Sequence, residues 1–107
     1  MTNYVVMKKI IDIPAEWKNT SALFVALGDE HRQRILLAFE PGERMNIMQI
    51  VAASTLSRSA VSHHLKVLRE SGALISEKVG KEVYFHIHAA QMEDALSRVL
   101  HYIKTQT

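Results

Sequence analysis

The residues best suited to specific chemistry are hydroxyls, histidines and cations gathered between positions 57 and 66, with two lysines near position 80. Hydroxyl and imidazole groups can donate hydrogen bonds to base edges, and cationic side chains pair with phosphates. The set is therefore suited to binding a nucleic-acid duplex. We predict contacts from eight side chains, which are Ser57, Arg58, Ser59, Ser62, His63, Lys66, Lys78 and Lys81.

Charge is unevenly spread along the 107-residue chain, whose formal net charge is +2. Residues 58–81 hold five basic and two acidic side chains, while the remainder is close to neutral. A basic stretch on a near-neutral body is typical of a surface that binds a polyanion. A solvated surface with lysines for solubility would give the same pattern, so charge alone does not separate the two interpretations.

Catalysis and metal binding have little support in the sequence. The chain has no cysteine, which excludes disulfides, thiolate metal sites, cysteine nucleophiles and thiol redox switches. No nucleophile, base and orienting acid can be assembled into a catalytic set, so we predict that the protein is not an enzyme and needs no cofactor. Six histidines are present, and among them only His88 and His101 are retained as candidate metal ligands.

The segment from Ser57 to Glu70 predicts an amphipathic helix capped by Ser57 and ended by Gly72. On a helical wheel its residues separate into two faces. The apolar face holds Ala60, Val61, His64, Leu65, Val67 and Leu68. The polar face holds Arg58, Ser59, Ser62, His63, Lys66 and Arg69. We expect His64 to be a buried structural residue with a backbone hydrogen-bond partner.

Other elements are predicted on both sides of this helix. Apolar spacing indicates helices over residues 15–28, from Asp29 to Pro41, from an Asn46 cap to about Ser54, and over residues 89–105. Residues 74–79 and 82–87 are expected to be strands joined around Gly80 and Lys81. In the second strand Val83, Phe85 and Ile87 should face inward, and Tyr84, His86 and His88 should face solvent.

Two of the three lysines among the predicted eight residues flank the tip of this hairpin. Lys78 and Lys81 are therefore expected to touch phosphates or to enter the minor groove. Their neighbours Glu77 and Glu82 should weaken the positive field at that point.

The order of helix, helix, helix, helix, strand, strand, helix predicts a mainly α fold with a small β-hairpin (α+β), a winged helix-turn-helix. We assign residues 1–107 to one domain, with residues 1–14 as an N-terminal extension. No apolar run approaches the roughly 18 residues of a membrane span, and charges interrupt the N-terminal segment. We therefore predict a cytoplasmic protein without a membrane partner.

The helices at residues 15–28 and 89–105 carry more apolar surface than one small core would hide. Pairing of these helices across a two-fold axis would bury that surface, so we predict a homodimer. The alternative is that both helices pack on their own domain. The residues expected at the dimer interface are Trp17, Phe24, Met92, Leu96, Val99, Leu100 and Ile103.

Two segments carry a family resemblance. Residues 27–36, which read LGDEHRQRIL, and residues 56–72, which read LSRSAVSHHLKVLRESG, resemble the ArsR/SmtB family of bacterial regulators. The spacing from Gly72 to Gly80 and the run from Val83 to Phe85 are similar to the wing of that family. The resemblance implies a dimeric repressor that binds an operator and is released by a signal.

The sequence departs from the family in places. Glu30 and His31 replace the usual proline-containing pair, and Ala73 stands where a leucine is common. The resemblance places metal ligands of the last helix at four positions, occupied here by His88, Ala90, His101 and Lys104. Two of the four ligands are present, and a lysine cation in the fourth place repels a metal. We therefore predict no metal site.

Together these observations predict a homodimeric repressor that binds a palindromic operator in double-stranded DNA and responds to a signal that does not involve cysteines. The alternative is a winged-helix module for protein interaction or RNA binding without operator specificity. The polar face of the helix at residues 57–70 favours DNA, because an interaction module has no need for that set of exposed donors and cations.

Overall fold

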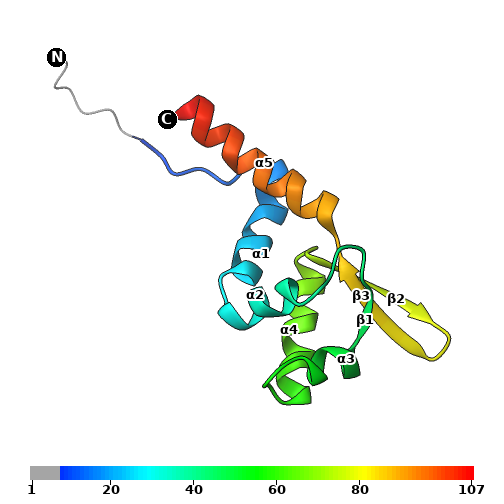
Figure 1. The fold of residues 1–107 in the computed structure, drawn as a ribbon. Helices are drawn as coiled ribbons and strands as arrows, with labels where there is room; N and C mark the ends of the chain where they lie inside the picture. Colours follow the sequence, from blue (N-terminus) through cyan, green and yellow to red (C-terminus); the bar gives the residue numbers. More distant parts are fainter. Residues whose placement is uncertain (1–7) are drawn as a thin grey trace.

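The computed structural model describes residues 8–107 (Figure 1). Its helical elements are η1 (Ala15–Trp17), α1 (Lys18–Leu27), α2 (Glu30–Leu37), α3 (Ile47–Ala52), α4 (Arg58–Glu70) and α5 (Ala89–Gln106). Its strands are β1 (Met45–Asn46), β2 (Leu74–Val79) and β3 (Glu82–Ile87). The predicted N-terminal extension lies partly outside the described residues, and residues 8–14 are exposed and form neither helix nor strand.

Local capping groups start α2, α3 and α4 where the sequence predicts, whereas the helix predicted over residues 15–28 begins as the 3-10 turn η1 and becomes α-helical at Lys18. Asp29 accepts a hydrogen bond from the Arg32 amide at 3.1 Å, and the Ser57 hydroxyl accepts one from the Ala60 amide at 3.2 Å. At α3, Asn46 and Gln49 exchange side-chain to backbone hydrogen bonds in a capping box. These bonds satisfy amides that have no partner inside the helix.

The end of α4 is fixed by a glycine, as predicted. Gly72 has a φ of +85°, its amide donates to the Arg69 carbonyl, and the Ala73 amide donates to the Leu68 carbonyl. This pair of bonds is the Schellman motif, which needs a left-handed residue after the C-cap. The chain thereby turns sharply from α4 into the wing.

The sheet has three antiparallel strands in the order β1-β3-β2. The predicted hairpin is confirmed, with Val79 opposite Glu82 and a two-residue turn at Gly80 and Lys81. The positive φ of +63° at Gly80 alone matches a type II′ turn. The third strand, β1, was not predicted, because two residues are too short to show an alternating pattern.

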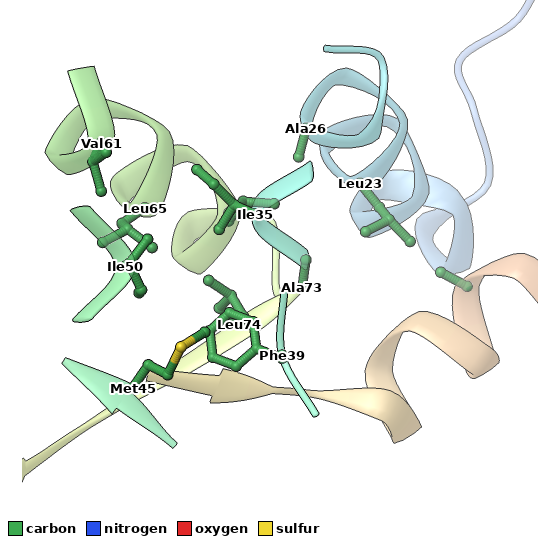
Figure 2. Close-up of a cluster of buried hydrophobic side chains, with 12 residues drawn as sticks. Leu23, Ala26, Ile35, Phe39, Met45, Ile50, Val61, Leu65, Ala73 and Leu74 are labelled. Carbon is green, nitrogen blue, oxygen red and sulfur yellow. The ribbon is translucent and has the colours of Figure 1, made fainter. Parts of the chain in front are cut away.

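The core gathers around the apolar face of α4 (Figure 2). Val61, Leu65 and Leu68 are fully buried against Ile50 of α3 and Leu74 of β2. Around them lie other buried side chains from α1, α2, the segment after α2, β1, the turn after α4, and α5, which are Leu23, Ala26, Ile35, Phe39, Met45, Ala73 and Ala95. α4 is thus held in place by contacts with α1, α2, α3 and β2.

The predicted alternation in β3 is only partly right. Phe85 and Ile87 pack against the core, but Val83 is 43% exposed. Its partner is Lys78, beyond the point where β1 ends opposite Tyr84, so no core reaches it. The side chains predicted to face solvent, Tyr84, His86 and His88, are half-buried.

The end helices pack together on one side of the molecule. α5 contacts α1 and continues past it, away from the sheet (Figure 1). The arrangement of α3, turn and α4 followed by the β2–β3 hairpin is a winged helix-turn-helix, as predicted. Across residues 8–107, no helix combines the length and the apolar character that a membrane span requires.

Candidate nucleic-acid interface

The candidate surface is the polar face of α4. All six residues that the helical wheel placed there are exposed, namely Arg58, Ser59, Ser62, His63, Lys66 and Arg69. Packing of the opposite face fixes the rotation of α4, which directs these side chains away from the domain. The structure therefore brings six hydrogen-bonding or cationic groups onto one helical surface.

The N-terminus of α4 is ordered by a short hydroxyl network. The Ser57 hydroxyl caps the helix and lies 3.3 Å from the Ser59 hydroxyl. In the preceding turn, the Ser54 hydroxyl accepts a hydrogen bond from the Leu56 amide at 2.7 Å. Free amides and the helix dipole make such an end attractive to phosphate.

The wing presents its lysines to solvent. Lys78 and Lys81 are exposed, and neither forms an ion pair with any residue from 8 to 107. The acidic neighbours are engaged elsewhere: Glu77 pairs with Arg44, and Glu82 accepts a hydrogen bond from the Asn46 amide group at 2.9 Å. The Arg44 cation offsets the charge of Glu77, so this carboxylate weakens the positive field of the wing less than the sequence suggests, while Glu82 keeps its charge.

His64 has a different partner from the one predicted. Its ring is half-buried on the core side of α4, and its Nδ1 lies 3.2 Å from Nη1 of Arg32, not near a backbone group. Burial lowers the pKa of His64, and the Arg32 charge adds to this effect, while Asp29 opposes it. The pKa of Asp29 is itself lowered, chiefly by the hydrogen bond from the Arg32 amide.

The sequence reasoning missed three residues that organise this surface. Arg32, Arg44 and Asn46 each bond to a group more than 30 positions away. A local pattern contains no signal for such pairs. Only the position of Asn46 as a helix cap could be read from the sequence.

The two candidate metal ligands lie at different points of the last helix. His88 is half-buried at its start, and His101 is exposed thirteen positions later. Within the described part of the chain, no three histidine, aspartate or glutamate side chains form a group that could hold a metal ion.

The residues predicted at the dimer interface divide by exposure. Phe24, Leu96, Leu100 and Ile103 are exposed, which leaves an apolar surface along α1 and α5. The half-buried members are Trp17, Val99 and Met92. Met92 packs on the core, and Trp17 makes an edge-to-face contact with Tyr102 at 5.6 Å between ring centroids.

Comparison with known proteins gives a consistent result. Residues 29–76, from the cap of α2 into β2, match the family model described as "Bacterial regulatory protein, arsR family". The transcriptional repressor SdpR of Bacillus subtilis is 25% identical over 81 residues, which cover 76% of this chain and 89% of that protein. The arsenical resistance operon repressor of Escherichia coli is 35% identical over 65 residues, 61% of this chain and 56% of the repressor's length.

Solved structures agree with the fold. An ArsR-like transcriptional regulator from Rhodococcus sp. RHA1 is 27% identical with a TM-score of 0.73, covering 82% of this chain and 81% of that one. A homodimeric winged helix-turn-helix DNA-binding domain from Mycobacterium bovis has a TM-score of 0.62 at 20% identity, covering 77% of each chain. At 20% identity, the similarity to the Mycobacterium bovis domain supports the fold alone.

Proposed function

Because residues 29–76 of this chain belong to the arsR family of bacterial regulatory proteins, we propose that the protein is a homodimeric repressor that binds a palindromic operator in double-stranded DNA. The family consists of DNA-binding transcriptional regulators and not of enzymes, in agreement with the sequence prediction. The observation that carries the proposal is the exposed polar face of α4, flanked by a wing with two unpaired lysines among the described residues.

The geometry of α4 suits a major groove. The groove is about 12 Å wide and admits one helix, whose side chains meet acceptors on the base edges. Ser59 and Ser62 are short enough for close approach of the backbone, and His63 and Lys66 extend further. In this arrangement α4 reads bases, while Lys78 and Lys81 hold phosphates on the flank.

A dimer would complete the site. The exposed apolar side chains of α1 and α5 have no cover in a single chain, and burying them against a second copy is favourable. Two recognition helices about 34 Å apart would then enter successive major grooves. The Mycobacterium bovis domain of the same fold is homodimeric, and the Bacillus subtilis relative is a transcriptional repressor.

The signal that releases the repressor must act on groups other than thiols, because the chain has no cysteine. The described residues also offer no cluster of metal-ligating side chains. We therefore propose a signal that is neither thiol-reactive nor held by a metal site of this part of the chain.

The proposal is tested by combining Ser62→Ala with His63→Ala. An operator is first selected from a random duplex library, and dissociation constants are measured for that operator and for a random duplex. Since base contacts carry specificity, we expect the affinity of the variant for the operator to fall about tenfold or more, and its affinity for the random duplex to fall far less.

The matched control combines Ser97→Ala with His101→Ala, which removes the same two side-chain types from exposed positions of α5. This control should bind both duplexes as the unaltered protein does. Equal losses on operator and random duplex in the α4 variant would refute base reading by α4. Binding to RNA or protein without duplex affinity would support the alternative module.

A further inference from the structure

One side chain of α2 joins the end of α1 to the middle of α4. The Arg32 guanidinium donates from Nε to the Ala26 carbonyl at 2.8 Å and from Nη2 to the Val25 carbonyl at 3.2 Å. Its remaining nitrogen, Nη1, lies 3.2 Å from Nδ1 of His64. A single planar group therefore contacts both helices.

The chemistry of the contact fixes its direction. Arginine carries only donors and does not lose its proton in proteins, so His64 must accept through an unprotonated Nδ1. The Val25 and Ala26 carbonyls lie at the negative end of the α1 dipole, which favours a cation there, and the Val25 carbonyl also accepts a hydrogen bond from the Gly28 amide at 3.3 Å. The guanidinium satisfies both needs at once, and a lysine could not match the fork geometry.

We propose that Arg32 is a positioning residue for DNA binding, which fixes the recognition helix α4 relative to α1 through His64. The inference rests on the proposed function, in which α1 is one of the two dimer helices. The orientation of α4 on α1 then sets the spacing of the two recognition helices across the dimer. The Arg32–His64 bond is therefore a determinant of binding to two half-sites at once.

The bond is sensitive to protons. His64 is faced by Arg32 and His31 of α2, by Asp29 at the start of α2, and by His63 of its own helix. From α1, the contacts made to Arg32 are backbone carbonyls. A proton on Nδ1 would remove the acceptor and place a second cation beside Arg32.

The sign of the pH effect follows from burial, which lowers the pKa of His64 below its ordinary value of 6.5. The folded protein therefore binds fewer protons at this ring than the unfolded chain does, and stability falls as the pH drops through and below 6.5. We expect the bond to be intact at neutral pH and to be lost on acidification.

The test compares two substitutions of the acceptor. His64→Leu removes it and keeps an apolar body, while His64→Asn keeps an acceptor near the position of Nδ1 and cannot titrate. Dissociation constants are measured at pH 7.5 for a selected operator with two half-sites and for a duplex with one half-site. We expect His64→Leu and Arg32→Lys to lower the affinity for the operator about tenfold, which is the effect of one charged hydrogen bond. Their affinity for the duplex with one half-site should fall less than about threefold.

His64→Asn should bind close to the unaltered protein at pH 7.5. It should also keep its preference for two half-sites as the pH is lowered stepwise below 6.5, whereas the unaltered protein should lose that preference once His64 takes up its proton. His31→Gln is the matched control, because its ring lies beside His64 at 5.8 Å without a hydrogen bond to it. This control should retain the pH dependence of the unaltered protein.

Two outcomes would overturn this inference and leave the proposed function standing. In the first, His64→Leu keeps its preference for two half-sites. In the second, His64→Leu loses affinity equally for both duplexes and has a lowered melting temperature. The second outcome would identify a purely structural bond. If the unaltered protein binds no duplex even at low salt, the proposed function fails, and this inference fails with it.

Discussion

At the scale of single residues, the interface depends on which side chains are free and which are occupied. Ser57 uses its hydroxyl to cap α4 and contacts the Ser59 hydroxyl, whereas Ser62 and Lys66 are exposed and form no side-chain hydrogen bond within residues 8–107. Removing the cap should weaken the helix itself, while removing an exposed group should change binding with little effect on folding. Substitutions of the residues predicted to contact DNA therefore measure different properties: that of Ser57 measures helix stability as well as binding, and that of Ser62 or Lys66 measures binding.

The faces of α4 were predictable because they follow from a period of 3.6 residues within one segment. The ion pair and the hydrogen bond that engage the acidic residues of the wing could not be predicted in this way. Arg44 and Asn46 engage Glu77 and Glu82 only because β1 lies beside β3, and β1 leaves no trace in the sequence pattern. Pairs that depend on tertiary position cannot be read from local spacing.

The wing lysines allow a prediction about phosphates. Lys78→Ala should weaken binding to operator and random duplex by similar factors, because a phosphate contact carries no base information. The slope of log affinity against log salt should flatten by about one counterion. Lys104→Ala, an exposed lysine of α5, is the control and should leave the slope unchanged. An unchanged slope in Lys78→Ala would exclude the contact.

At the scale of elements, the sequence predicted the boundaries well where capping groups are local. Asp29, Asn46 and Ser57 cap helices within three residues of themselves, so each start could be inferred before the fold was known. The burial predicted for Val83 was wrong, because alternation shows which residues of a strand share a face but does not show how far the core extends along that face. Strand β1 was not predicted for a related reason, because its pairing with β3 is entirely non-local.

Two glycines at element junctions should differ in their tolerance of a methyl group. A Cβ at Gly80 would meet nothing within 4 Å, whereas one at Gly72 would lie 2.9 Å from Cγ of Gln91. Both have positive φ, so Gly80→Ala should cost about 1 kcal/mol of unfolding free energy. Gly72→Ala should cost about 2–3 kcal/mol, since crowding adds to the backbone strain.

Urea denaturation of both variants measures this difference, and a double variant tests its cause. Adding Gln91→Ala to Gly72→Ala removes the crowded atom, so the remaining cost should approach that of Gly80→Ala. Equal costs for the two single variants would mean that the turn after α4 adjusts freely. The connection between α4 and the wing would then be less rigid than its Schellman motif indicates.

At the scale of the whole molecule, the chain is divided between a packed body and an uncovered helical surface. The core lies around α4, and from α5 only Ala95 is fully buried in it. Leu100 and Ile103 of α5 are each 51% exposed. Apolar spacing predicted this surplus, but a single sequence cannot say what covers it, because self-packing and pairing use the same residues.

Pairing through α5 makes a prediction that separates these two uses. Leu100→Glu places a charge in the centre of the proposed interface, where burial without a partner is costly, so it should shift the protein from dimer to monomer in sedimentation equilibrium. The affinity for a duplex with two half-sites should fall to that for one half-site. Because Leu100 is half-exposed in a single chain, the melting of the monomer should change little.

Leu37→Glu is the matched control, since Leu37 of α2 is 83% exposed and lies outside the proposed interface. It introduces the same charge in place of the same side chain, so any effect of charge alone on DNA affinity appears in both variants. A dimer that persists in Leu100→Glu, or one that dissociates equally in Leu37→Glu, would remove α5 from the interface. The two recognition helices would then need another element to hold them one helical turn apart.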